Sequence, residues 1–159
     1  MIRAGIIGAT GYAGAEILRI LAVHPNVEVK WIGSRSYADQ KIASVYGNLF
    51  HVVDLSLIND DTEQMKKEIL KLADEVDVIF TATPQGACAG LVSRELLEKV
   101  KIIDMSADFR LKDVSVYEAW YKIHHASPEF LPEAVYGLVE INRKDIPSAR
   151  LLANPGCYT

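Results

Sequence analysis

The sequence of 159 residues contains only two cysteines, and it has no excess of positive charge and no long apolar run. Two thiols are too few for the disulfide framework of a small secreted domain, so we expect a reducing, cytoplasmic setting. The formal net charge of −4 provides no basic surface for nucleic acid. No stretch approaches the ~18–20 apolar residues of a membrane span, and the N-terminus lacks the pattern of a secretory signal. We therefore expect no nucleic-acid partner and no membrane partner.

Metal ligands are also scarce. The adjacent His124 and His125 have no cysteine or carboxylate cluster at metal-ligand spacing, so we expect no metal site. What remains is an ordinary globular composition, with 50% hydrophobic and 24% charged residues. A chain of this length fits one domain and can bury a real core.

The first fourteen residues contain the most informative motif. An apolar run over 2–7 is followed by glycines at positions 8, 11 and 14, and then by apolar residues at helical spacing from Ile17 onward. Strand, glycine turn and helix together form the context that a dinucleotide-binding loop requires. The glycines permit a tight turn, close approach to a pyrophosphate and close packing of the helix, whose N-terminus presents free N–H groups to the phosphates. The candidate cofactor-binding residues here are Gly8, Thr10, Gly11, Tyr12, Ala13 and Gly14.

The glycine spacing is G-x-x-G-x-x-G, which is less common than G-x-G-x-x-G and weak evidence by itself. A glycine-rich turn without a ligand is the alternative interpretation. The flanking strand and helix favour nucleotide binding over that alternative.

A second candidate for the cofactor site follows the strand expected at 27–32. An NAD site has a carboxylate about 20 residues beyond the glycines to bind the ribose 2′-OH, whereas an NADP site has an arginine nearby. Ser34, Arg35 and Ser36 occupy this position, and no acid follows until Asp39. A guanidinium between two hydroxyls can bind a 2′-phosphate by charge-assisted hydrogen bonds, so the motif favours NADP. The alternative is an exposed loop arginine without a ligand.

Strand and helix patterns alternate along the chain. Strand patterns begin near residues 2, 27, 77, 101 and 151, and the run at 76–82 is typical of a parallel strand buried on both faces. Amphipathic patterns predict helices over 63–74 and 87–100. The segment 52–57 indicates an edge-like strand, and 136–143 resembles a loop that enters a helix. The alternation predicts an α/β fold with a doubly wound, mostly parallel sheet, which is a Rossmann-type dinucleotide-binding domain.

Ligands of such sheets bind beyond the carboxyl ends of the strands. Thr83 and Pro84, in the loop after 76–82, are further candidates for cofactor contact. Five loops are expected to meet at this edge, and they bring there Gly8, Ser34, the stretch 81–86, Ser106 and Cys157.

Cys157 follows Pro155 and Gly156 at the carboxyl end of the last expected strand, where a helix is expected to start. A thiol there faces solvent near backbone N–H groups, which favour the nucleophilic thiolate. A cofactor loop and an exposed thiol at one edge of a sheet indicate a reductase that works through a thioester. The alternative is a chance cysteine near a terminus. Cys88 lies among small residues and is expected to be a buried filler.

Five motifs together resemble one enzyme family. GATGYAG at 8–14, SRS at 34–36, DMSADFR at 104–110, YGLVEINR at 136–143 and NPGCY at 154–158 match the N-acetyl-gamma-glutamyl-phosphate reductase family in order. The wider relatives of that family are the aspartate-semialdehyde dehydrogenases. The resemblance implies an NADP-dependent oxidoreductase of arginine biosynthesis, which converts N-acetylglutamyl 5-phosphate into N-acetylglutamate 5-semialdehyde and phosphate. In the family pattern, the thiol that matches Cys157 attacks the acyl phosphate, and hydride from NADPH reduces the resulting thioester.

The resemblance also implies a domain arrangement. Family members are roughly twice as long, so 1–159 is expected to be the NADP-binding domain, ending at the strand that bears the nucleophile, without the C-terminal substrate domain. The other half would supply a histidine acid/base and the main dimer interface, so we expect a homo-oligomer for the full-length enzyme and no activity for this chain alone. Candidate residues for binding the small acyl-phosphate substrate are Ser106, Arg110 and Asn154.

Two alternatives stay open. The related reductase of lysine biosynthesis acts on a carrier-bound aminoadipyl phosphate and differs in its substrate domain, which this sequence does not include. A non-catalytic NADP-binding module would need the glycine loop and Arg35 but not Cys157. Thiol reactivity that changes when NADPH is added would distinguish an enzyme from such a module.

Overall fold

The computed structural model describes residues 1–159 and forms one seven-stranded sheet in the order β3-β2-β1-β4-β5-β7-β6. Every pair of neighbouring strands is parallel, which confirms the predicted doubly wound α/β fold. The strands are β1 (Ile2–Ile7), β2 (Val27–Gly33), β3 (Leu57–Ile58), β4 (Val78–Thr81), β5 (Lys101–Asp104), β6 (Val135–Tyr136) and β7 (Leu151–Ala153).

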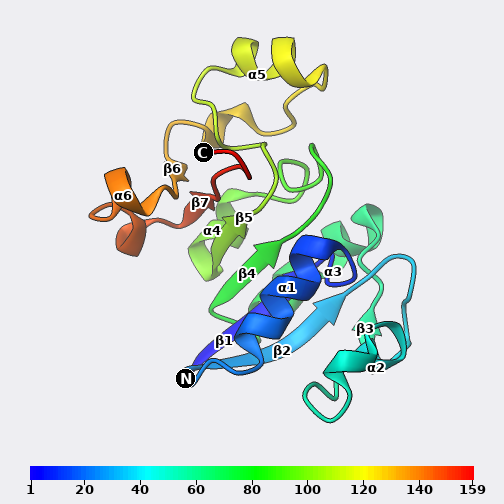
Figure 1. Ribbon diagram of the computed structural model, residues 1–159. Coiled ribbons are helices and arrows are strands. Elements are labelled where there is room, and N and C mark those ends of the chain that lie inside the picture. Colours follow the sequence, from blue (N-terminus) through cyan, green and yellow to red (C-terminus); the bar gives the residue numbers. More distant parts are fainter.

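The helices lie on both faces of the sheet, as Figure 1 shows, with α1 in front of β1 and β2 and α3 behind them. The α-helices are α1 (Tyr12–Leu21), α2 (Ile42–Val45), α3 (Thr62–Ala73), α4 (Arg94–Lys99), α5 (Val114–Tyr121) and α6 (Val139–Asn142). Three short 3-10 helices complete the chain, η1 (Gly47–Leu49), η2 (Pro128–Phe130) and η3 (Ile146–Ser148). None of these helices is long and apolar enough to cross a membrane.

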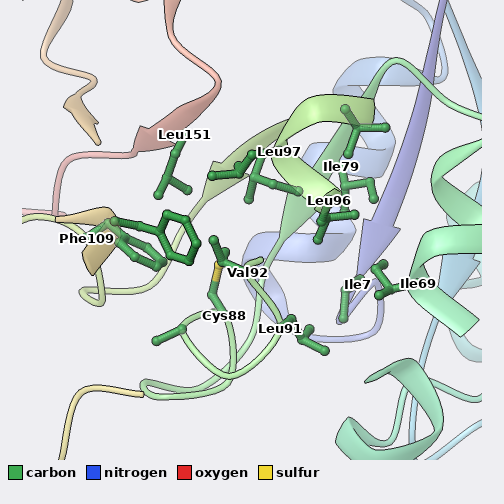
Figure 2. Close-up of a cluster of buried hydrophobic side chains, with 14 of the residues drawn as sticks. Ile7, Ile69, Ile79, Cys88, Leu91, Val92, Leu96, Leu97, Phe109 and Leu151 are labelled. Atoms are coloured by element: carbon green, nitrogen blue, oxygen red, sulfur yellow. The ribbon is translucent and has the colours of Figure 1, made fainter. Parts of the chain in front are cut away.

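The face of the sheet that α3 and α4 cover contains the larger core. Ile79, Ile102 and Leu151 are register partners across β4, β5 and β7, and all three are buried there. Figure 2 shows Ile79 and Leu151 in one cluster with Leu96 and Leu97 of α4. Removing this apolar surface from water is the main force that holds the helices against the sheet.

The opposite face is covered over only part of its width. Ile6 and Ile32 are buried beneath Leu18 of α1 in the second core cluster. Their register neighbours farther along the sheet, Phe80 of β4 and Ile103 of β5, remain partly exposed. The expectation that β4 is buried on both faces therefore holds for Val78, Ile79 and Thr81 but not for Phe80, because α1 packs on β1 and β2 and leaves Phe80 partly open.

The helix predicted over 87–100 forms only at its end, as α4. Ser93 caps α4 by accepting a hydrogen bond from the Leu96 N–H at 3.2 Å. The preceding residues form a series of turns, because the buried Asp108 carboxylate accepts hydrogen bonds from the N–H groups of Gly86 at 2.8 Å and Ala89 at 3.0 Å. The side-chain acceptor replaces the regular helical pattern, and the helix prediction is wrong for these residues.

Two strand boundaries also differ from expectation. The edge strand expected over 52–57 is only the two-residue β3, Leu57–Ile58. Tyr136, the first residue of the segment expected to be a loop, pairs with β7 as part of the edge strand β6, Val135–Tyr136. Two-residue strands carry almost no pattern of alternation, so pairing with a neighbour rather than local sequence determines them.

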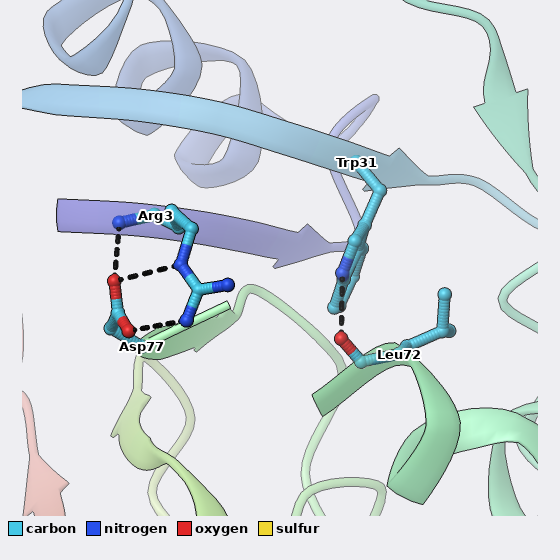
Figure 3. A network of polar contacts seen from close by, with 4 residues as sticks. All are labelled: Arg3, Trp31, Leu72 and Asp77. Carbon is cyan, nitrogen blue, oxygen red and sulfur yellow. Dashed lines mark hydrogen bonds and ion pairs between the residues drawn. The ribbon is translucent and has the colours of Figure 1, made fainter. Parts of the chain in front are cut away.

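Polar contacts secure the edge of the sheet opposite the expected ligand site. The Asp77 carboxylate accepts hydrogen bonds from the backbone and guanidinium of Arg3, with an Nη2–Oδ1 distance of 2.7 Å (Figure 3). These hydrogen bonds lower the pKa of Asp77 from 3.8 to about 2. Trp31 donates from Nε1 to the Leu72 carbonyl at 3.3 Å, which ties β2 to α3.

Candidate functional site

A cleft of about 570 Å³ lies at the carboxyl ends of the strands, between the turn after β1, the segment after β2 and the loop after β4. It brings together eight of the residues predicted to bind the cofactor: Gly8, Thr10, Gly11, Ser34, Arg35, Ser36, Thr83 and Pro84. Five further residues complete its lining: Asp60, Thr62, Ala82, Gly86 and Ala87. Three separate sequence motifs therefore share one cleft.

The glycine turn can form only without side chains at two positions. Gly8 has a φ of 79°, and a Cβ added there would lie 2.3 Å from the Ala82 carbonyl oxygen on β4's loop. A Cβ on Gly14 would lie 2.1 Å from the Gly8 carbonyl oxygen. Gly14 is buried and lets α1 pack against the turn, but it does not line the cleft. Its contribution is to the path of the backbone.

The other two residues of this motif lie outside the cleft. Tyr12 is 94% exposed, and Ala13 is also exposed. Gly11 is the N-cap of α1 and has no side chain to bond the first N–H groups of the helix. These N–H groups and the positive end of the helix dipole are available to an anion.

The segment after β2 places an unpaired cation in the cleft. Arg35 is exposed, and its guanidinium forms neither an ion pair nor a hydrogen bond within the protein. The preceding Ser34 is 2% exposed, and its hydroxyl lies 2.7 Å from the hydroxyl of Thr10. Tyr46 donates to the Thr10 carbonyl oxygen at 2.8 Å and so braces the glycine turn from α2's side. Arg35 thus projects from a rigid base.

Thr83 supplies a second sign that the cleft is built for a ligand. Its Oγ1 is buried and has no hydrogen-bond partner. An unsatisfied buried hydroxyl costs about 1–3 kcal/mol, so such groups in native proteins usually meet a ligand or water. A glycine turn, a free helix N-terminus, an unpaired arginine and an orphan hydroxyl together fit the phosphates and ribose of a dinucleotide.

Asp60 lines the same cleft, and the sequence analysis missed it. Its Oδ2 accepts a hydrogen bond from the Gly8 N–H at 2.7 Å. Burial raises the pKa of Asp60, while the Gly8 N–H and the charge of Arg35 oppose that rise. Asp60 follows the two-residue β3, so no strand pattern marks it as the end of a strand. Only the pairing of β3 with β2 brings it to the site.

A second group of predicted residues lies at the same edge of the sheet, after β5 and β7. Arg110 donates from Nε to the Asn154 carbonyl at 2.8 Å and from Nη2 to the Met105 carbonyl at 2.8 Å. It therefore joins the ends of β7 and β5. A Cβ added to Gly156 would lie 3.3 Å from Arg110 Nη1, so the guanidinium also lies against the turn before Cys157. The thiol of Cys157 itself is exposed.

The side chains of Ser106 and Asn154 are occupied within the protein. Ser106 donates to Asp104 Oδ2 at 2.8 Å and accepts from the Asp108 N–H at 3.1 Å, all in buried surroundings. Asn154 donates to the Pro155 carbonyl at 3.0 Å, which stabilises the turn. Asp104 also accepts from Thr81 at 3.0 Å, and burial raises its pKa. These contacts order the base of the second group.

Cys88 lies in the larger hydrophobic core, as Figure 2 shows. It is 0% exposed, and burial raises the pKa of its thiol well above the ordinary value. The prediction that Cys88 is a buried filler is confirmed. No group of three or more histidine, cysteine, aspartate or glutamate side chains is arranged to hold a metal ion.

Both groups lie at the carboxyl ends of the strands, but they do not line the same pocket. None of Ser106, Arg110, Asn154 and Cys157 lines the cleft that contains the glycine turn and Arg35. The expected convergence of five loops is therefore resolved into two neighbouring groups, one around β1, β2 and β4 and one around β5 and β7.

Comparisons with known proteins also support the interpretation of the cleft as a dinucleotide-binding site. The family model described as semialdehyde dehydrogenase, NAD binding domain, matches residues 3–149. Two curated relatives are named N-acetyl-gamma-glutamyl-phosphate reductase. The one from Lachnospira eligens is 59% identical over 160 residues, covering 100% of this chain and 44% of the relative. The one from Lachnoclostridium phytofermentans is 56% identical over 158 residues, covering 99% of this chain and 44% of the relative.

Solved structures show the same fold at low sequence identity. An aspartate semialdehyde dehydrogenase with NADP from Candida albicans superposes with a TM-score of 0.59 at 14% identity, over 97% of this chain and 42% of that one. Aspartate semialdehyde dehydrogenase II from Vibrio cholerae, complexed with ASA, gives a TM-score of 0.60 at 16% identity, over 99% and 42%.

The chain spans 44% of the length of these two curated relatives. Their names confirm the resemblance that the five motifs indicated. With the family model matching nearly the whole chain, the protein belongs to the semialdehyde dehydrogenase, NAD binding domain family.

Proposed function

We propose that the protein takes part in the NADPH-dependent reduction of N-acetylglutamyl 5-phosphate to N-acetylglutamate 5-semialdehyde and phosphate. The observation that supports this most strongly is the placement of an exposed thiol, Cys157, at the edge of the sheet that also bears the dinucleotide cleft. Relatives at 59% and 56% identity are named for this reaction rather than for the reduction of an aminoadipyl phosphate.

The cofactor in this proposal is NADP, and the chain's own residues would bind it in the cleft. The N–H groups at Gly11 and the start of α1 would face the pyrophosphate, and the Thr83 hydroxyl would find its missing partner there. Arg35, with Ser34 and Ser36 beside it, would bind the 2′-phosphate through charge-assisted hydrogen bonds. When bound, the nicotinamide supplies the hydride.

The nucleophile in this proposal is the Sγ atom of Cys157. The thiolate forms a bond to the acyl carbon, the carbon–oxygen bond to phosphate breaks, and phosphate leaves with the electron pair. The resulting thioester accepts a hydride and a proton to give a thiohemiacetal, which releases the aldehyde and returns the thiol. Arg110 binds the backbone at Asn154, just before the thiol's turn, and at Met105 after β5, and its Nη1 would remain available to the anionic substrate.

Residues 1–159 form the cofactor-binding part of the enzyme in this proposal, and residues outside this range provide the acid/base group and most of the substrate contacts. Full-length relatives are more than twice as long as the matched region, which supports such a division. We also propose that the enzyme is cytoplasmic, in keeping with its two unpaired thiols, and that the full-length enzyme is homo-oligomeric, as the family resemblance implies.

The reverse reaction tests this proposal. The complete enzyme is mixed with N-acetylglutamate 5-semialdehyde, phosphate and NADP⁺, and NADPH formation is followed by absorbance. We expect turnover that requires phosphate and that stops after alkylation of Cys157. Turnover that is independent of phosphate, or that survives complete alkylation of Cys157, would contradict the proposal.

A further inference from the structure

Asp60 is the one acidic side chain among the residues that line the cofactor cleft, and it joins the ends of three strands. It follows β3 and accepts a hydrogen bond from the Gly8 N–H after β1. Its Cβ also lies 2.7 Å from the place that a Cβ on Gly33 of β2 would occupy. Asp60 is therefore fixed in position by the backbone around it.

The charge of Asp60 lies near Arg35 without neutralising it. The two side chains form no ion pair within 4.0 Å, although the charge of Arg35 opposes the rise in the pKa of Asp60. Arg35 therefore remains free to bind an anion. A ligand phosphate that reaches Arg35 also meets the field of a carboxylate held in the same cleft.

The two nicotinamide cofactors differ where these two charges act. NADPH has a 2′-phosphate that carries nearly two negative charges, whereas NADH has a 2′-hydroxyl that can donate a hydrogen bond. Carboxylates in dinucleotide folds accept that hydrogen bond, and arginines accommodate the phosphate. This cleft contains one residue of each kind. The Arg35 side chain favours NADPH, and the Asp60 side chain opposes it.

We propose that Asp60 is a specificity-determining residue, whose fixed carboxylate limits the preference for NADPH that Arg35 creates. This inference rests on the proposed use of NADP by the cleft. Its consequence is that removing the charge increases discrimination between the two cofactors. A residue that only braced the glycine turn would affect both cofactors alike.

The test measures dissociation constants for NADPH and NADH with the unmodified protein and with Asp60→Asn. Asparagine keeps the size of the side chain and can still accept the Gly8 N–H bond through its carbonyl oxygen. We expect the ratio of NADH to NADPH dissociation constants to rise about fivefold at low ionic strength. We expect this increase to shrink as salt screens the charges.

Asp61→Asn is the matched control. Asp61 is the neighbouring acid, but it accepts from the Glu63 N–H as the N-cap of α3 and does not line the cleft. Asparagine is also a good N-cap, so this variant should leave the cofactor ratio unchanged. If Asp60→Asn does not fold, Asp60→Ser removes the same charge and should raise the ratio in the same direction.

An equal loss of affinity for both cofactors in Asp60→Asn, or a ratio that moves toward NADH, would overturn the proposal. So would a ratio change of the same size in Asp61→Asn. Failure of the proposed function gives a different result, because the unmodified protein would then bind neither cofactor.

Discussion

The two ends of the ligand-binding edge differ in how their polar groups are used. Around β1, β2 and β4, Arg35 has no ion-pair partner, and the buried Thr83 Oγ1 has no hydrogen-bond partner. The first N–H groups of α1 also have no side-chain cap. Around β5 and β7, Ser106 and Arg110 donate most of their hydrogen bonds to the protein itself. The first end is arranged to receive a ligand, and the second is arranged to hold a backbone turn.

The covering of the sheet also changes across its width, although at a different strand. Near β1 and β2, α1 and α3 pack on opposite faces, and the core row of Ile6 and Ile32 is buried. Near β4 and β5, Phe80 and Ile103 of the same row line an open groove with Ile2. Substitutions at the two ends should separate binding from chemistry.

The largest expected effect comes from Cys157→Ser. An unactivated hydroxyl is a far poorer nucleophile than a thiolate, so we expect reduction by the complete enzyme to fall on the order of 10³-fold or more. NADPH binding should stay within about twofold, because Cys157 does not line the cleft. Cys88→Ala, which alters only the buried thiol, should retain most of the activity. Steady-state rates measure the activity, and fluorescence titrations measure NADPH binding. Loss of NADPH affinity in Cys157→Ser would contradict the separation of cofactor binding from chemistry.

The next largest effect is expected for Gly14→Ala. The new Cβ would lie 2.1 Å from the Gly8 carbonyl oxygen and 2.8 Å from Ala9 Cα, so the turn must shift. We expect the free energy of unfolding to fall by about 1–3 kcal/mol and NADPH binding to be lost. A Cβ on Gly47 meets nothing within 4 Å, so Gly47→Ala should stay within about 0.5 kcal/mol. Denaturant melts and titrations of both variants test this, and unchanged NADPH binding in Gly14→Ala would contradict it.

A smaller and more selective effect is expected for Arg35→Ala. Loss of the charge-assisted contact should weaken NADPH binding at least about tenfold, or about 1.4 kcal/mol, while NADH affinity changes little. Arg35→Asp should reverse the preference, because a second carboxylate repels the 2′-phosphate. Parallel titrations with the two nucleotides measure both variants. Equal losses for NADPH and NADH would show that Arg35 does not contact the 2′-phosphate.

The smallest effect is expected far from either group, at Asp77. Arg3 lowers the pKa of Asp77 from 3.8 to about 2. The ion pair therefore stabilises the folded protein fully above pH 3.8, and this contribution is lost as the pH falls towards 2. The pair is solvent-accessible, so we expect Asp77→Asn to cost under about 1 kcal/mol at neutral pH and nothing at the acid limit. Unfolding free energies measured across this range check the sign, and a cost that grows on acidification would contradict it.

Sequence reasoning predicted that the residues after β1, β2 and β4 lie close together, because the signals in these segments are local. In the sequence, strand patterns come directly before the glycines at 8, 11 and 14 and before the arginine at 35. The structure places Gly8, Gly11 and Arg35 in one cleft. The spacing of apolar residues in the flanking strands and helix was enough to place these residues at the ends of strands.

The features that sequence reasoning missed depend on contacts distant in the chain. Asp60 reaches the cleft only through the pairing of the two-residue β3 with β2. The helix expected over 87–100 is shortened by Asp108, which lies 19 and 22 residues from the N–H groups that it binds. No local pattern encodes a side-chain acceptor supplied from a later loop.

The most direct test of the account is a titration of the unmodified protein with NADPH and with NADH, followed by nicotinamide fluorescence. The central claim is that the cleft lined by Gly8, Arg35 and Thr83 binds NADP through its pyrophosphate and 2′-phosphate. We expect saturable binding of both nucleotides, with NADPH at least about tenfold tighter. Equal affinity for the two nucleotides, or no binding of NADPH by the folded protein, would contradict it.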